Sequence, residues 1–327
     1  MRRAALFKSP EVQAMPDTFI DTLHDHAVRD LAWVIGSPGL LDGSHNAYSG
    51  HVVDDSWCNA QLLSCASWLT ALDEHPLPLH GFIRARPTRR LGHYFETLIQ
   101  FLLTHLPDTQ LLATNLQVQD EQRTQGEYDF LFRSKGKVYH WEAAVKFYLQ
   151  VEPLAEQQAF IGPGTRDRLD LKLNKVFKQQ LLLSDSPAGQ QTLPQGFKPD
   201  VTQAFIKGYL FYHTTTNCRP AVAGISAAHL SGWWMRYGVD KIPQTTADSR
   251  WVLLPRLGWL APALITDPAQ VLEHAVLNER LAEHFNLSME AVLVFELISI
   301  PKGGWKEVSR GFVVCSSWPI ITPSESS

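Results

Sequence analysis

The chain has 327 residues, of which 45% are hydrophobic and 19% are charged, and it carries a net charge of −4 at pH 7. Such a composition is that of a globular protein long enough to bury one large core or two modest ones. The net charge argues against a protein that coats DNA through global attraction. The sequence contains no run of about 18 apolar residues, so we expect no transmembrane helix.

The N-terminus and the cysteines bear on the cellular compartment. Residues 1–8 include basic side chains but no apolar stretch long enough for a signal peptide. The four cysteines, at positions 58, 65, 218 and 315, lack the close pairing of a metal site. We therefore expect a cytoplasmic protein with reduced, mostly buried thiols. The oligomeric state is left open.

In chain order, residues 1–90 predict a helical N-terminal extension. Apolar residues recur at helical spacing over residues 17–35 and 55–72. The turn at residues 37–39 and the proline-rich segment 75–79 are expected to end these helices.

Residues 91–213 predict the core of an α/β fold. A helix is expected over residues 91–103, a strand over 111–118, a hairpin over 126–149, a basic amphipathic helix over 166–183 and a strand over 204–212. The segment 184–199, rich in Ser, Pro, Gly and Gln, predicts a loop.

Residues 214–327 predict a Trp-rich α+β portion packed on this core. A helix is expected over 268–285 and strands over 291–300 and 311–314. The tryptophans lie among Leu, Met and Ala, which favours a buried core over stacking on nucleic-acid bases. Residues 322–327 are expected to be disordered.

The hairpin carries the chemically most informative pattern. With period two, Tyr128, Phe130 and Phe132 point to one face and Asp129 to the other. On the second strand, Glu142 lies on the face opposite the aromatic side chains. The short polar linker 133–137 contains a glycine and suits a tight turn. Asp129 and Glu142 are therefore expected to approach closely enough to share a divalent cation.

This arrangement resembles the PD-(D/E)XK nuclease superfamily, which has the restriction-endonuclease-like fold. The expected order α-β-β-β-α-β is that of the superfamily's core. The resemblance implies Mg²⁺ or Mn²⁺ held by Asp129 and Glu142, with Glu96 completing the acidic cluster and Lys146 assisting catalysis. The superfamily lysine normally stands two residues after the second acid, where this chain has Ala144, so Lys146 lies about 7 Å further along the strand.

The wider chain resembles a bacterial family known as domain of unknown function 1853. The resemblance is carried by segments distributed over most of the chain: VRDLAW (28–33), LGHYFE (91–96), EYDF (127–130), EAAVKFYL (142–149), DRLDLKL (167–173), GWW (232–234) and LPRLGWL (254–260). It implies a fold and a site, and it leaves the substrate open.

Two basic clusters flank the expected site in sequence. One precedes the helix at residue 91 and includes Arg89 and Arg90. The other has five basic and two acidic residues between positions 166 and 178. Both predict contacts to nucleic-acid phosphates, and a solvated surface is the equally weighted alternative. The residues expected to bind nucleic acid are Arg89, Arg90, Arg166, Arg168, Lys172 and Lys175.

Two functions follow from these patterns. The first is metal-dependent hydrolysis of phosphodiester bonds in DNA or RNA by Asp129, Glu142, Glu96 and Lys146. The second is a catalytically inactive protein of the same fold that binds nucleic acid or another protein, which the displaced lysine favours.

Overall fold

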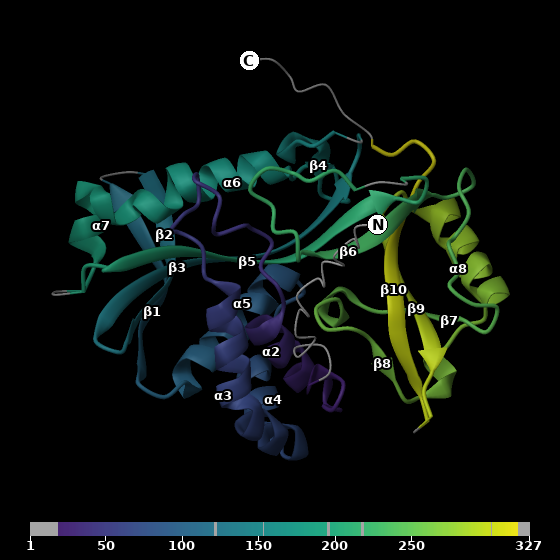
Figure 1. Ribbon diagram of the computed structural model, residues 1–327, viewed down its shortest axis with the longest axis horizontal. Helices are drawn as coiled ribbons and strands as arrows, with labels where there is room; N and C mark the ends of the chain where they lie inside the picture. The colour runs from purple at the N-terminus through teal and green to yellow at the C-terminus, as the bar shows by residue number, and fades with distance from the viewer. Residues whose placement is uncertain are drawn as a thin grey trace, which may run out of the picture.

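A ten-stranded mixed sheet extends through the whole computed structural model, which describes residues 19–120, 123–152, 154–194, 197–216, 219–301 and 303–319 (Figure 1). The strand order is β1-β2-β3-β5-β6-β10-β9-β7, with β4 beside β3 and β8 beside β10. The strands are β1 Thr109–Asp120, β2 Arg123–Ser134, β3 Lys137–Gln150, β4 Phe160–Ile161, β5 Val201–His213, β6 Leu230–Arg236, β7 Arg250–Leu253, β8 Leu264–Ile265, β9 Val292–Ser299 and β10 Trp305–Val314.

Helices cover both faces of the β1 to β5 part of this sheet. On one face lie α2 (His26–Gly36), α3 (Asp55–Glu74), α4 (Leu77–Arg84) and α5 (Leu91–His105). On the other lie α6 (Leu169–Lys178), the 3-10 helix η2 (Gln180–Asp185) and α7 (Pro187–Thr192). Strand β3 alternates as predicted, because Trp141 and Val145 pack toward α5 while Tyr148 packs toward α6. The predicted assignment of the β3 side chains to the two faces of the sheet is therefore confirmed.

Helix α3 matches its predicted segment closely, whereas α2 begins at His26, nine residues after the predicted start at residue 17. Asp25 caps α2 by accepting hydrogen bonds from the N–H groups of Ala27 and Val28, and Asp54 caps α3 through the N–H of Ser56. Residues 17 and 18 of the first predicted helix lie outside the described residues. The proline-rich segment ends α3 as expected, but it also begins α4, because proline is tolerated in the first turn of a helix.

Two predictions around the basic helix are wrong in their boundaries. Helix α6 spans Leu169–Lys178, so Arg166 and Arg168 precede it. The helix ends at Gln179, whose non-helical φ of −134° separates α6 from η2. The segment predicted as a loop contains α7, because Ser186 accepts a hydrogen bond from the N–H of Gly189 and Pro187 takes the first helical position.

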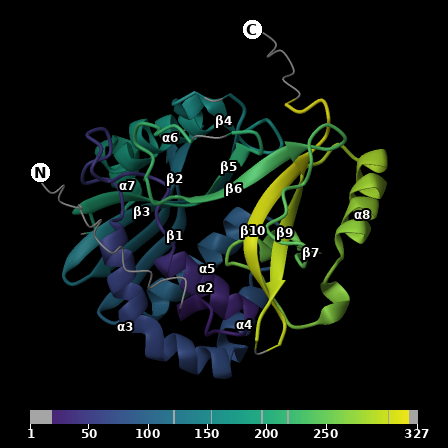
Figure 2. The ribbon, with the colours of Figure 1, turned by 45° about the vertical axis from the view of Figure 1, so that its right-hand side comes forward.

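The C-terminal part continues the sheet (Figure 2). Strand β6 pairs in parallel with β5 and with β10, and α8 (His274–Leu287) packs on the outer side of β9 and β10. The predicted start of this helix at residue 268 is wrong, because Asp267 caps the separate 3-10 helix η4 (Pro268–Gln270). The short strands β6, β7 and β8 were not predicted. The division at residues 90 and 213 stays a prediction.

Buried polar groups join the N-terminal helices to the C-terminal part. Asp30 accepts hydrogen bonds from the N–H of Ala261 at 2.9 Å and from the hydroxyl of Tyr94 at 2.9 Å. Arg310, which is 2% exposed, donates to Glu307 at 2.6 Å and to the carbonyl of Ala261 at 3.1 Å. Because each charge has a partner, the cost of burying it is offset.

The described cysteines lie in the interior as predicted, whereas the tryptophans are buried or half-buried. Cys58, Cys65 and Cys315 are free and buried, and Cys218 lies outside the described residues. Trp234 and Trp251 are fully buried. Among the helices that the structure describes, none combines the length and the apolar character needed to cross a membrane. The predicted disorder of residues 322–327, like the N-terminal residues 1–8, falls outside the described ranges.

Candidate active site

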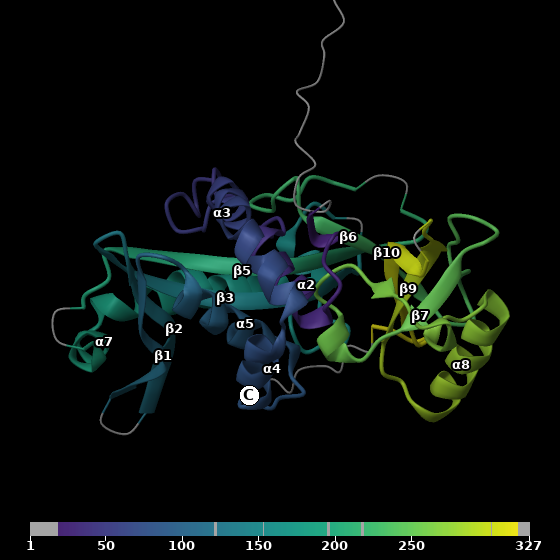
Figure 3. The same cartoon turned by 90° about the horizontal axis from the view of Figure 1, so that it is seen from below.

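The predicted hairpin places Asp129 and Glu142 together where two strands part. Lys135 and Gly136 form a two-residue turn with φ 47° and 80°, and Ser134 pairs with Lys137. The ladder between β2 and β3 ends at the pair of Phe130 and Trp141, although both strands continue. Figure 3 shows the far end of the β1–β2 hairpin bending away from β3. Asp129 and Glu142 are the next residues beyond the last pair, at the fork of the two strands.

The alternation of β2 changes at this fork. Phe130 and Phe132 pack in the α5-side core, but Tyr128 packs with Leu131 and its ring lies 4.8 Å from His140 on the α6 side. The prediction that Tyr128, Phe130 and Phe132 share one face is therefore wrong for Tyr128. Asn115, which lies on β1 between the partners of Phe130 and Tyr128, has φ 50°.

Both carboxyl groups are buried and close enough to influence one another. Asp129 is 8% exposed and Glu142 is 2% exposed. Burial, together with the charge of Glu142, raises the pKa of Asp129 to about 7. Burial raises the pKa of Glu142 to about 8. The charge of Lys172 and a hydrogen bond with Asp129 both lower this pKa, but their effect is smaller. At neutral pH the pair therefore retains a proton when no cation offsets its charge.

Both oxygens of Glu142 are also hydrogen-bonded to other side chains. His140 Nε2 lies 3.0 Å from Oε1, and the amide of Gln180 in η2 donates to Oε2. His140 is fully buried, and burial lowers its pKa to about 4, so its ring is neutral. The Nδ1 atom of His140 has no hydrogen-bond partner among the described residues. Sequence reasoning missed His140 and Gln180, although His140 stands on the predicted face of Glu142.

Lys172 is the lysine that interacts with both acids. It extends from α6, its ammonium donates to Gln180 Oε1 at 3.2 Å, and the charges of Glu142 and Asp129 oppose the lowering of its pKa by burial. Lys146 shares the strand face of Glu142, and its ammonium bonds to Asp167 Oδ2 at 2.5 Å. The sequence placed Lys172 among the residues that bind nucleic acid, since helical spacing alone does not reveal which side chain of α6 enters the site.

Glu96 approaches Asp129 from the opposite face. It lies on α5, and burial and the charge of Asp129 raise its pKa to about 7, while a hydrogen bond with Asn115 lowers it. It also lines a polar hollow of about 350 Å³ together with Arg86 and His93. The charge of Asp129 thus acts on Glu96, and the part of Glu96 in an acidic cluster with Glu142 stays a prediction.

The predicted nucleic-acid contacts occupy two sides of the sheet. Arg89 and Arg90 are exposed just before α5, whereas Arg166, Arg168 and Lys175 are exposed on the α6 side. Arg168 is engaged by Asp170, with N–O distances of 2.6 and 2.9 Å. The two groups therefore lie on opposite faces of the sheet, and Arg168 lies beside Ile161, which pairs with Leu149 toward the end of β3 away from the fork.

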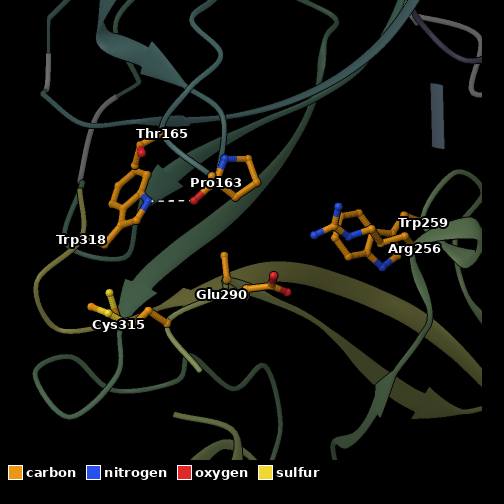
Figure 4. A pocket seen from close by; sticks show the side chains of 10 residues that line it. Pro163, Thr165, Arg256, Trp259, Glu290, Cys315 and Trp318 are labelled. Atoms are coloured by element: carbon orange, nitrogen blue, oxygen red, sulfur yellow. Dashed lines mark hydrogen bonds between the residues drawn. The ribbon is translucent and has the colours of Figure 1, made fainter. Parts of the chain in front are cut away.

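The loop before α6 borders a separate hollow of about 420 Å³, shown in Figure 4. Trp318 closes one side by donating its indole N–H to the carbonyl of Pro163 at 3.0 Å. Arg256 and Glu290 contribute opposite charges to its lining. Neither Thr165 nor Asp167 caps α6, because Arg168 occupies the N-cap position and makes no side-chain capping bond. Thr165 instead has φ 61° and lines the hollow.

The acid pair is compatible with a divalent cation, but the described residues do not supply a complete set of protein ligands for one. Within the described residues, no three side chains of His, Cys, Asp or Glu are grouped to hold a metal ion. Mg²⁺ usually takes one or two carboxylates and completes its shell with water and substrate phosphate. Two adjacent buried carboxyls with raised pKa values suit such a cation, because its charge would relieve their repulsion.

The fold and the site define a mixed α/β protein with two paired acids and a lysine at a fork in its sheet. The chain belongs to the family described as Domain of unknown function (DUF1853), whose model matches residues 29–314. No curated protein and no solved structure shows significant similarity to the chain. The family assignment covers the site but does not supply an activity.

Proposed function

We propose that this protein is a metal-dependent nuclease that hydrolyses phosphodiester bonds in DNA or RNA, built on a restriction-endonuclease-like core. The main support is the meeting of Asp129, Glu142 and Lys172 at the fork between β2 and β3. The element order α5-β1-β2-β3-α6-β5, with β3 parallel to β5, agrees with that core.

Asp129 and Glu142 would hold Mg²⁺ or Mn²⁺. The cation would polarise the scissile phosphate and lower the pKa of a bound water. Asp129 is held in place because its Oδ2 accepts the N–H of Ala143 at 2.9 Å, which anchors the carboxylate to β3. Glu96 would add negative charge from the α5 side. Burial and the charge of Asp129 both raise its pKa.

Lys172 takes the role that the sequence assigned to Lys146. Lys172 is half-buried and its charge acts on both acids, so it would offset the charge that develops on a phosphate oxygen. Gln180 orients it by accepting one of its hydrogens and donating to Glu142. The positive charge of Lys146 lowers the pKa of Lys172, and Lys146 is itself paired with Asp167.

A cleavage assay on mixed DNA and RNA substrates with Mg²⁺ or Mn²⁺ tests the proposal. We expect metal-dependent cleavage by the wild type, complete loss in Asp129→Asn, and a loss of about a hundredfold or more in Lys172→Ala. Lys175→Ala is the matched control, because Lys175 is exposed on the same helix. It should alter cleavage only about threefold, as expected for a phosphate contact screened by solvent.

Lys146→Ala separates the two lysine assignments. If it loses about a hundredfold while Lys172→Ala cleaves normally, Lys146 is the catalytic lysine despite its bond to Asp167. A wild type that cleaves no substrate with either metal contradicts the proposed activity altogether.

The second candidate is a non-catalytic protein that uses the same fold for binding. One observation favours it: both oxygens of Glu142 are hydrogen-bonded to protein groups, so the carboxyl is satisfied without a metal. In that case the wild type binds nucleic acid with salt-dependent affinity and cleaves nothing.

A further inference from the structure

A cavity of about 630 Å³ lies between the start of α3 and the turn that joins β2 to β3. It is on the α5 side of the sheet, because Phe132 and Trp141 line it and both belong to the core on that side. Trp141 neighbours Glu142 in sequence, but their side chains lie on opposite faces. The sheet therefore separates this cavity from the acid pair.

Aromatic rings form one wall of the cavity. Phe132 stacks on Tyr139 with ring centroids 5.1 Å apart, and Trp57 meets Trp141 edge to face at 5.4 Å. Trp141 is held from behind by Phe205, whose ring is parallel to it at 4.8 Å. Packing of the rings against each other keeps this wall rigid. Trp57 and Tyr139 remain half-buried, so they retain ring surface that a ligand can contact.

Carboxylates accompany the rings. Asp54 and Asp108 both line the cavity, and Lys135 is the one cationic residue in its lining, so the formal charge of the lining is −1 (two acids and one base). Hydrogen bonds from Ser56 lower the pKa of Asp54, which is therefore ionised at neutral pH. A negative cavity repels phosphate, whereas a cation gains from both the carboxylates and the ring faces.

We propose that this cavity binds a small organic cation, an amine or quaternary ammonium group carried on an apolar or aromatic body. The aromatic wall of Trp57 and Tyr139 would contact the body and the cationic head, and Asp54 at the N-cap of α3 would offset the positive charge. The site is independent of the proposed nuclease activity, because it uses none of the residues at the fork.

Calorimetric titration with three compounds that share one ring tests this. Benzyltrimethylammonium is the cationic probe, benzyl alcohol the neutral one and benzoate the anionic one. We expect saturable binding of the cation, with affinity at least about tenfold above that of the alcohol, and no binding of benzoate. Equal affinity for the cation and the alcohol would show an unselective apolar cavity and overturn the proposal, as would tighter binding of benzoate or no saturable binding of the cation.

Asp54→Asn is the decisive variant, because asparagine also caps helices and so preserves the start of α3 while removing the charge. It should weaken the cation about tenfold and leave benzyl alcohol unchanged. Asp42→Asn is the matched control, since Asp42 accepts a hydrogen bond from the N–H of Ser44 two residues on, as Asp54 does from Ser56, and does not line the cavity.

Substitution of Trp57 tests the ring contribution. Trp57→Leu should weaken the cation about tenfold, and Trp57→Phe, which keeps a ring with a weaker π face, should fall between Leu and the wild type. Unchanged affinity in Asp54→Asn or in Trp57→Leu contradicts the proposal. Cleavage by the Asp54→Asn variant should equal that of the wild type, so failure of this site and failure of the nuclease proposal are read from separate measurements.

Discussion

The buried acid pair should make the free energy of unfolding decrease as pH rises, and Glu142→Gln should make this decrease smaller. Burial raises the pKa of Glu142 to about 8, and burial with the charge of Glu142 raises that of Asp129 to about 7, whereas carboxyls of an unfolded chain titrate near about 4. Between these values the folded protein holds protons that the unfolded chain has released. Its free energy of unfolding is therefore highest below about pH 4 with respect to these groups and decreases as pH rises toward 8.

The size of the effect follows from the shift. One pKa unit corresponds to about 1.4 kcal/mol, so a single carboxyl of this kind costs about 2 to 3 kcal/mol of stability between pH 5 and pH 7. Glutamine imitates the protonated acid, because its amide can donate to the neutral ring of His140 and its carbonyl can accept from Gln180. Removing the charge at position 142 also lowers the pKa of Asp129, which flattens the profile further.

Urea unfolding followed by tryptophan fluorescence, from pH 5 to pH 8 in the presence of a chelator, measures this directly. The chain has 10 tryptophans, several of them buried, so the signal reports the folded core. Wild type should lose stability across the range, and Glu142→Gln should lose at least about 3 kcal/mol less. Parallel profiles for the two proteins would refute the raised pKa and the burial argument behind it.

Three further outcomes are expected. Mn²⁺ should raise the melting temperature of the wild type more at pH 8 than at pH 6, because protons compete for the acid pair, and Asp129→Asn should lose this response; a response independent of pH would count against the pair as ligands. Arg310→Met should lower the free energy of unfolding by about 3–5 kcal/mol in urea titrations, because it leaves Glu307 buried without its partner, and a loss below about 1 kcal/mol would show that the pair is dispensable. Gly208→Ala should be similarly damaging in the same titration, since Gly208 has φ 139° and an added Cβ would lie 1.8 Å from the carbonyl oxygen of Lys146, and a fully stable variant would contradict the packing of β3 on β5.

Local spacing predicted the parts of the site that depend on the repeat of a single strand or turn. The alternation of β3 put Glu142 on the face opposite Trp141, because side chains of a strand alternate with period two. The Lys135-Gly136 turn brought Asp129 to Glu142, because a two-residue turn sets the register of both strands. The helix before the hairpin and the strand after it were also correct for the same reason.

Tertiary packing decided the rest. The sequence could not show that the charge of Lys172 acts on both acids, because that depends on how α6 crosses the sheet. Nor could it show that Lys146 is paired with Asp167. Tyr128 packs beside Leu131 and His140, on the face opposite to the one that alternation along β2 predicted. Strands β6 and β10 pair in parallel although they are far apart in the chain. The residues that line the aromatic cavity likewise come from distant parts of the chain. Spacing along the chain encodes which face a side chain occupies, whereas the partner it meets there is set by long-range packing of faces that have no common period.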